Sequence, residues 1–261
     1  MIIDTHAHYD DEAYENDREE VLGALPSQDI CAVVNMGASM EGARNSVALS
    51  AHYPHVYCGV GIHPDSVGVL DDTAMEELRT MCRADKCVCI GEIGLDYYWN
   101  VEPHEVQKEA FVKQILLAQE EGLPINVHSR DAAQDTFDII RDNHRNSTGG
   151  IIHAFSGSVE LAREYVKMGF FLGVGGVVTF KNGKTLKKVV EDTPIEYLVT
   201  ETDCPYLTPE PFRGKRNTSA NIRYIVDMIA QIKGIPIPEC EQILIKNACR
   251  AYPRLGKALN I

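Results

Sequence analysis

Two histidines near the start of the chain, His6 and His8, have the type and spacing of metal ligands. They end an apolar run, residues 2–6, that is typical of a β-strand. Because successive side chains of a strand point to opposite faces, residues two apart share a face. Two imidazoles held side by side at a strand end can bind a divalent cation. The pattern predicts a metal site here, with two ordinary surface histidines as the alternative.

Four further residues of ligand type lie at or just past the ends of other strand-like runs. They are Glu92, His128, His153 and Asp203. A buried carboxylate or imidazole is costly unless it is paired or coordinated, and six such ligands are enough for two divalent cations. Each residue alone has a structural explanation, as a salt-bridged acid, a hydrogen-bonded core histidine or a helix cap. Their regular placement favours a metal centre built from several strands.

Eight apolar, β-branched runs bounded by turn residues are the predicted strands. They cover residues 2–6, 30–36, 56–62, 87–93, 124–128, 150–154, 170–174 and 196–200. Helix-like segments lie between the strands and after the last one. They cover residues 17–25, 40–52, 71–83, 103–121, 131–144, 158–168, 183–191, 219–233 and 238–251.

This alternation predicts an α/β fold, a (β/α)8 TIM-like barrel that forms a single domain over residues 1–261. Functional residues of such barrels lie at the C-terminal ends of the strands, which is where the potential ligands fall. An open doubly wound sheet is the competing architecture. It is disfavoured because no GxGxxG-type turn follows the first strand and because the ligands come from too many strands.

The composition limits the partners and the compartment. A formal net charge of −13 should repel polyanions, so a nucleic acid would have to be attracted locally, for example by bound cations. No stretch approaches the roughly 18 apolar residues of a membrane span, and the first residues do not resemble a signal peptide. The eight cysteines include no CxxC pair, which indicates reduced thiols. We expect a cytoplasmic protein that does not enter a membrane.

Six strings in the chain resemble the successive motifs of the TatD family of metal-dependent DNases, within the amidohydrolase-like barrels. They are DTHAH from Asp4, GIHP from Gly61, GEIGLDYY from Gly91, PINVHSRDA from Pro124, HAFSGS from His153 and ETDCPYL from Glu201. The resemblance extends from the first strand to about residue 247. It implies a TIM-like barrel that hydrolyses phosphodiester bonds, typically as a 3′-to-5′ exonuclease supported by Mg²⁺ or Mn²⁺.

The resemblance also implies how two divalent metal ions would be held. It places His6, His8, Glu92 and Asp203 on one ion and Glu92, His128 and His153 on the other, with Glu92 bridging. Mg²⁺ or Mn²⁺ would act in function, although Zn²⁺ or another ion could be the bound species. The expected substrate is single-stranded DNA, with RNA as an alternative, and no obligatory protein partner is evident.

Two acidic residues other than the bridging Glu92 are catalytic candidates. Asp203 could accept a proton from the attacking water, a role that its metal ligation would weaken. Glu201 lies two residues earlier and is a candidate base or orienting residue, against the alternative of a salt bridge in the core. The family usually has Asn-Glu-Pro where this chain has Asn217-Thr218-Ser219. The contacts of this loop are therefore in doubt, and Thr218 or Ser219 could simply cap the next helix.

Residues that could bind the substrate follow several strands at the same end of the predicted barrel. They are His63, Arg130, Ser156 and Tyr206, whose imidazole, guanidinium and hydroxyl groups could hold phosphate oxygens. The structural alternatives are an ion pair of Arg130 with an acid and core packing of Tyr206. The aromatic run 97–99 could stack on a base or pack within its loop. The basic run 181–188 could rim the site or be a solvated face.

Three functions are compatible with these residues. A two-metal nuclease is the leading hypothesis. The alternative within enzymes is a metal-dependent hydrolase of another ester or an amide, because a fold does not fix a function. The family resemblance adds a D-aminoacyl-tRNA deacylase to this alternative. A metal-retaining binding protein without turnover is the third. It is disfavoured because a purely structural metal needs no bridging carboxylate and no open coordination position.

Overall fold

The structure, a computed structural model, describes residues 1–144 and 148–261. Within these residues one sheet has eight strands, all parallel and in sequence order. They are β1 (Ile2–Ala7), β2 (Ile30–Met36), β3 (Val56–Val60), β4 (Cys87–Asp96), β5 (Ile125–Arg130), β6 (Gly150–Ile152), β7 (Phe171–Val174) and β8 (Leu198–Thr200).

The sheet closes where its last strand returns to the first. A parallel bridge joins Ala7 to Cys204, and the Thr5 hydroxyl donates a hydrogen bond of 3.0 Å to the carbonyl of Thr200. The amide of Asp203 donates to the carbonyl of His6 at 3.0 Å. The predicted (β/α)8 barrel is therefore confirmed, and the competing open sheet is wrong.

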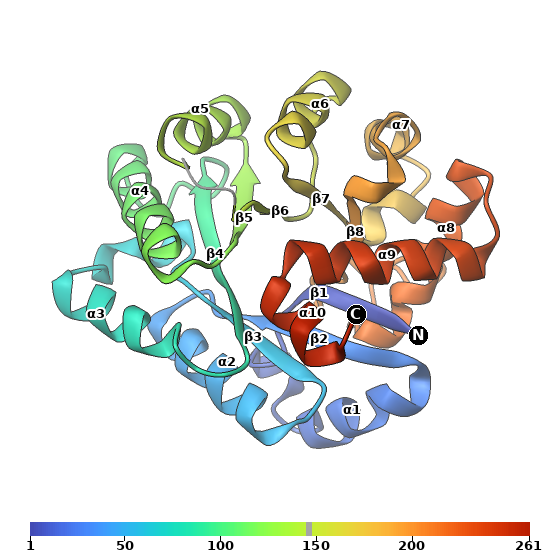
Figure 1. Cartoon of the computed structure of the whole chain (residues 1–261), viewed down its shortest axis with the longest axis horizontal. Helices are drawn as coiled ribbons and strands as arrows, with labels where there is room; N and C mark the ends of the chain where they lie inside the picture. The colour runs from blue at the N-terminus through green and yellow to red at the C-terminus, as the bar shows by residue number, and fades with distance from the viewer. Residues whose placement is uncertain (145–147) are drawn as a thin grey trace.

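Helices connect the strands and surround the barrel (Figure 1). They are α1 (Arg18–Ala24), α2 (Met40–His52), α3 (Asp72–Met81), α4 (His104–Glu121), α5 (Ala133–Asn143), α6 (Val159–Lys167) and α7 (Lys184–Asp192), and after β8 come α8 (Ile222–Lys233), α9 (Ile237–Ala251) and α10 (Pro253–Leu259). In α4, Phe111, Ile115 and Ala118 recur at helical spacing and are buried. The helix ends at Gly122, whose φ of 65° is a left-handed conformation that favours glycine.

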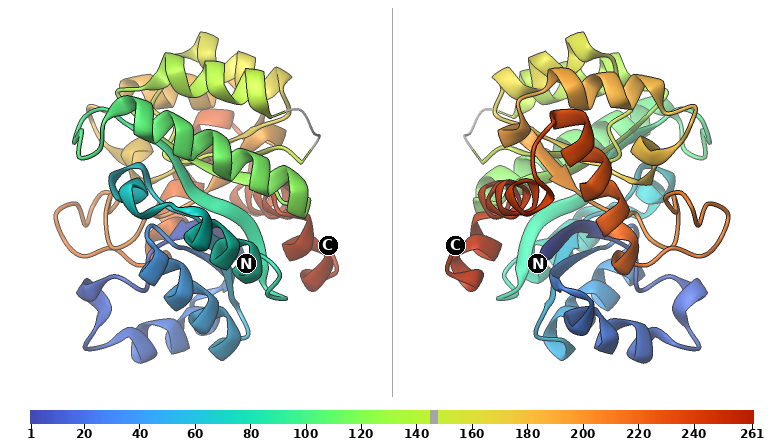
Figure 2. Two further views of the ribbon diagram at one scale, coloured as in Figure 1. Left: turned by 90° about the vertical axis from the view of Figure 1, so that its left-hand side faces the viewer. Right: turned by 90° about the vertical axis from the view of Figure 1, so that its right-hand side faces the viewer.

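The interior of the barrel has its own apolar cluster, which the C-terminal helices close from one end. Tyr252 and Leu255 pack there with Ile3, Val34 and Val88. Figure 1 shows α9 lying across the strands, and Figure 2 shows the two chain termini close together at this end. The carboxyl ends of the strands therefore form the open end of the barrel.

No helix among the described residues has the length and apolar character needed to cross a membrane.

Several predicted boundaries differ from the structure. The expected strand 196–200 is shorter because a 3₁₀ turn, Ile195–Tyr197, follows Pro194, whose carbonyl accepts the amide of Tyr197. β6 ends at Ile152, so His153 lies beyond the strand. The expected helix 219–233 begins with a 3₁₀ turn, Ser219–Asn221, before α8. The sequence pattern also missed α10. All eight cysteines are free thiols, as expected.

Candidate metal centre

A cavity of about 900 Å³ opens at the carboxyl ends of the strands. Most of the residues singled out from the sequence line it: His8, His63, Glu92, His128, Arg130, His153, Ser156, Asp203 and Tyr206. The side chains of His6 and Glu201 are completely buried behind its wall. The structure thus brings every predicted site residue to this cavity or directly behind it.

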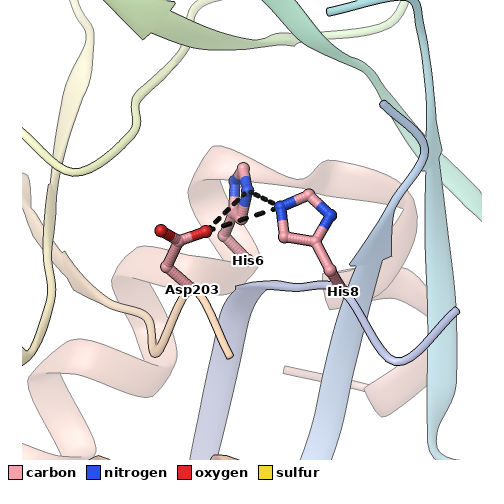
Figure 3. A group of neighbouring side chains, drawn as sticks. All are labelled: His6, His8 and Asp203. Carbon is pink, nitrogen blue, oxygen red and sulfur yellow. Dashed lines mark hydrogen bonds and ion pairs between the residues drawn. The ribbon is translucent and has the colours of Figure 1, made fainter. Parts of the chain in front are cut away.

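Four side-chain atoms, from β1 and the residue after it, from β4 and from the segment after β8, form a compact first ligand set. The Nε2 atoms of His6 and His8 are 3.0 Å apart. Glu92 Oε2 lies 3.5 and 3.4 Å from them, and Asp203 Oδ1 lies 3.7 and 3.4 Å from them. A tetrahedral cation with bonds of about 2.0–2.2 Å separates its ligands by about 3.3–3.6 Å. Three of the five spacings lie in this range, whereas the 3.0 Å between the two Nε2 atoms is shorter and the 3.7 Å from Asp203 Oδ1 to His6 Nε2 is slightly longer. Figure 3 shows His6, His8 and Asp203 directed at one another.

The outer nitrogens of the two histidines fix which nitrogen faces the site. Nδ1 of His6 is 2.9 Å from the side-chain oxygen of Asn126, and Nδ1 of His8 is 3.0 Å from the carbonyl of Met36. Both partners are acceptors, so each Nδ1 carries a proton and Nε2 is the atom that faces the site, with a lone pair whenever the ring is neutral. Burial alone would lower the pKa of His8, but the carboxylates of Asp203 and Glu92 raise it well above its usual range. Two facing lone pairs repel unless a proton or a cation lies between them. The donor set therefore fits a divalent metal.

The second carboxylate oxygen of Glu92 faces a second ligand set. Glu92 Oε1 lies 2.9 Å from His128 Nδ1 and 3.6 Å from His153 Nε2. The other ring nitrogens again have carboxylate partners, since His128 Nε2 is 2.9 Å from Asp96 Oδ2 and His153 Nδ1 is 2.9 Å from Glu201 Oε1. Glu92 stands between the two sets with one oxygen directed to each. This arrangement suits a carboxylate that bridges two ions.

Glu201 acts on the centre from behind His153. Its side chain is fully buried, and its Oε1 accepts the amide of Ala154 at 2.6 Å. A Cβ at position 173 would lie 2.4 Å from Glu201 Oε2, so Gly173 makes room for this carboxylate. The position suits a residue that orients His153. It does not suit direct removal of a proton from a water in the cavity.

His63 differs from the other four histidines of the cavity. Its Nδ1 accepts the backbone amide of Asp65 at 3.2 Å, so the neutral ring carries its proton on Nε2. That atom points into the site, 3.9 Å from Glu92 Oε1. Burial lowers the pKa of His63 to about 4, which keeps the ring neutral. In this tautomer His63 offers the site a hydrogen-bond donor.

Apart from Glu201, the side chains that hold the ligands in place were not predicted from the sequence. Asp96 and Asn126 orient His128 and His6, and Asn126 in turn donates to the Tyr252 hydroxyl at 2.7 Å. Since alternate strand residues share a face, the position of Asn126 two residues before His128 could have indicated its direction. No signal of this kind marks Tyr252, because it comes from the helical end of the chain.

A second support lies beneath the first ligand set. Asp4 is completely buried, and burial raises its pKa to about 6 against the hydrogen bonds of Ser219 and Thr202. The Ser219 hydroxyl donates to Asp4 Oδ2 at 2.6 Å. Thr218 is the N-cap residue of the 3₁₀ turn Ser219–Asn221, but its side chain makes no capping hydrogen bond, and Ser219 lies within the turn. Ser219 connects the 3₁₀ turn before α8 to β1.

The protonation of His153 predicts how the thermal stability of the metal-free protein depends on pH. Burial alone would lower the pKa of His153, but Glu201, Asp203 and Glu92 raise it to about 9, above the unfolded value of about 6.5. A raised pKa stabilises the fold fully below pH 6.5, and this stabilisation is lost as the pH rises to 9. A divalent cation can replace the proton. We expect the melting temperature in EDTA to fall across this window and the increase produced by Mg²⁺ to grow.

Thermal unfolding at several pH values, with EDTA and with Mg²⁺, measures both effects. His153→Gln should weaken the pH dependence, whereas His52→Gln, a change at an exposed histidine of α2, should leave it intact. A metal-free melting temperature that stays level or rises between pH 6.5 and 9 would show that the carboxylates do not hold a proton on His153.

The chain is similar over nearly its whole length to proteins of one family. A family model described as TatD related DNase matches residues 3–253. The uncharacterized metal-dependent hydrolase YabD of Bacillus subtilis is 40% identical over 252 residues, which cover 97% of this chain and 99% of that protein. The uncharacterized metal-dependent hydrolase TatD of Mycobacterium tuberculosis is 34% identical over 260 residues, with 96% and 97% covered.

A solved structure shows the same architecture. The crystal structure of YjjV, a TatD homologue from Escherichia coli, superposes with a TM-score of 0.89 and 27% sequence identity, and the match covers 97% of this chain and 98% of that chain. Sequence and fold thus point to the same group of proteins.

Proposed function

Because the chain belongs to the TatD-related DNase family and is a metal-dependent hydrolase, we propose that it is a deoxyribonuclease that binds two divalent metal ions and cleaves single-stranded DNA from the 3′ end. The observation that supports this proposal most strongly is the position of Glu92. One of its oxygens faces His6, His8 and Asp203, and the other faces His128 and His153. The 3′-to-5′ direction follows from the family resemblance.

The metal ligands and the other residues of the cavity would contribute differently to such a reaction. Two bound ions would activate a water and stabilise the attacking and leaving oxygens of an in-line displacement. Asp203 lies at the cavity, where it can orient the water and accept its proton. Burial alone would raise the pKa of Asp203, but His153, His8 and His6 hold it below its usual range. Asp203 is therefore a weak base whose main contribution is its charge.

The charge of the cavity explains why an anionic substrate would need the metals. Six carboxylates line it, from Asp10, Asp11, Asp65, Glu92, Asp96 and Asp203. Among the described residues that line the cavity, Arg130 is the one arginine, and none is a lysine. Without cations the cavity repels a phosphodiester, and two divalent ions would offset most of this negative charge. The first turn of α7 reaches the rim through Gly183, Thr185 and Leu186, next to Lys184 of the basic run.

Two side chains are placed to bind non-bridging phosphate oxygens. His63 presents its neutral Nε2–H, as its contact with Asp65 requires. Arg130 makes no ion pair within residues 1–144 and 148–261, so the expected alternative of an acid partner is not observed. Ser156 and Tyr206 also line the cavity, and the Tyr206 hydroxyl donates to Asp11 at 2.7 Å. Tyr206 is 55% exposed, which rules out core packing.

The donor role of His63 can be separated from metal ligation. His63→Ala should lower kcat/KM by about 10²-fold, the scale of losing one donor to a developing negative charge, without loss of bound metal. His63→Gln keeps an N–H donor and should recover part of the activity. Because the ring is neutral, neither variant should shift the acid limb of the pH profile. Metal analysis and steady-state kinetics test this, and loss of an ion from His63→Ala would make His63 a ligand instead.

The proposed function is tested with single-stranded DNA labelled at either end. With Mg²⁺, a 5′-labelled strand should shorten stepwise while a 3′-labelled strand releases its label at once as a mononucleotide, and EDTA should stop both. D-aminoacyl-tRNA and small carboxylic esters serve as parallel substrates. If they turn over and DNA stays intact, the chain is the alternative hydrolase.

A further inference from the structure

Two aromatic side chains stand exposed beside the metal centre. Tyr98 is 55% and Trp99 is 61% exposed, and Trp99 lines the same cavity as Glu92. Asp96 fixes their loop, because its Oδ1 accepts the amides of Tyr98 at 3.0 Å and Trp99 at 2.9 Å. Its other oxygen is the partner of His128. One carboxylate therefore holds both a residue of the metal centre and the aromatic pair at a fixed separation.

The neighbouring Tyr97 shows what a packing role looks like in this loop. Its ring stacks on His104 with centroids 3.6 Å apart, and its hydroxyl donates to Asp135 at 2.7 Å. Tyr98 and Trp99 are more exposed and contact each other edge to face. Exposed large apolar surface on a globular protein commonly marks a binding site. Packing therefore accounts for Tyr97, whereas Tyr98 and Trp99 keep large exposed ring surfaces.

Arg130 connects the aromatic pair to the phosphate chemistry of the cavity. Its guanidinium carbon lies 4.0 Å from the centroid of the Tyr98 ring and 5.5 Å from that of Trp99. Such cation–π contacts fix the direction of the side chain. They leave its N–H groups available, because no acid pairs with Arg130 in the part of the chain that the structure describes. The oriented guanidinium can bind a phosphate, and the exposed indole beside it can stack on a base.

We propose that Trp99, Tyr98 and Arg130 form a nucleotide subsite at the cavity rim, which binds an unpaired nucleotide of the substrate strand. Trp99 stacks on the base, and Arg130, oriented by Tyr98, binds a phosphate of the same strand. Stacking needs a free base face, which a single strand offers and the interior of a duplex does not. The subsite rests on the proposed nuclease function, and it gives that function a preference for single strands.

The chain reports on this subsite directly, because Trp99 is its only tryptophan. The probe is a single-stranded deoxyadenosine hexamer, added with Mg²⁺ to the slow variant Asp203→Asn. We expect the hexamer to quench the fluorescence of Trp99 and to bind about 10-fold more tightly than the same sugar-phosphate chain without its bases. Unchanged emission at saturation, or equal affinity of the abasic chain, would overturn the proposal.

Kinetics give an independent test. Trp99→Ala should raise KM for the hexamer about 10-fold, more than it lowers kcat, and Trp99→Phe should retain most of the affinity. Val101→Ala is the matched control, since Val101 is also 61% exposed in the same loop, and it should keep KM within about twofold of the parent. Arg130→Ala should weaken binding and reduce the salt dependence of log affinity by about 0.7. A Trp99→Ala protein with the parent's KM would overturn the subsite.

Failure of the subsite proposal and failure of the nuclease proposal give different results. If the hexamer quenches Trp99 but wild-type protein never hydrolyses it, the subsite stands and the nuclease proposal fails. If the hexamer is hydrolysed and the emission of Trp99 does not change, the nuclease proposal stands and the subsite fails.

Discussion

Replacing Asp203 with asparagine should reduce kcat by roughly 10³-fold, the scale on which losing one strong electrostatic stabiliser slows an enzyme. The change removes a negative charge from the first ligand set at nearly constant volume. Asp203 has a φ of 54°, a left-handed conformation that asparagine also accepts, so the fold should persist. Single-turnover kinetics on labelled DNA, with melting curves for both proteins, measure the effect.

A control separates ligation from the general charge of the cavity. Asp11 also lines the cavity, but its carboxylate accepts a hydrogen bond of 2.7 Å from the Tyr206 hydroxyl. Asp11→Asn removes the same charge from the same cavity and should lower kcat less than about tenfold. If Asp203→Asn behaves like Asp11→Asn, Asp203 does not take part in the reaction.

Glu92→Gln should cause the protein to lose both metal ions and nearly all activity. Each oxygen of Glu92 serves a different ligand set, whereas glutamine offers one oxygen and turns an N–H₂ group toward the other set. Burial alone would raise the pKa of Glu92, but His6, His128 and His8 hold it well below its usual range, so the group is ionised and ready to bind a cation. Elemental analysis after dialysis should show about two ions in the wild type.

The matched control for this experiment is Glu201→Gln. Glu201 contacts His153 from behind, so its replacement should weaken metal affinity by about 10–100-fold and leave the stoichiometry at saturation unchanged. A Glu92→Gln protein that retains two tightly bound ions would refute the bridging role.

The barrel could be predicted because its strands are continuous apolar runs with polar side chains at their ends. A parallel strand buried on both faces, such as β2, leaves little doubt about its extent. β8 was harder, because Pro194 starts a 3₁₀ turn within a run of similar hydropathy. α10 escaped because Pro253 looks like a helix breaker but stands at the first turn, where a missing N–H costs nothing.

The candidate site could also be predicted only in part from the sequence. The six predicted ligands could be picked out because histidine and carboxylate at strand ends are chemically conspicuous. Asp4 and Asp96 could not, because their part depends on contacts made across the fold, such as that between Asp4 and Ser219. The direction of the His63 ring depends on a single backbone amide, that of Asp65, which no sequence pattern reveals.

Diffraction from crystals of the Mn²⁺-loaded protein tests the metal centre most directly. Anomalous scattering should show two peaks about 4 Å apart, the first among His6, His8, Glu92 and Asp203 and the second among Glu92, His128 and His153. Glu92 should lie between the peaks with one oxygen bound to each ion. A single peak at saturating Mn²⁺, or two peaks that Glu92 does not bridge, would contradict the assignment of a two-metal centre.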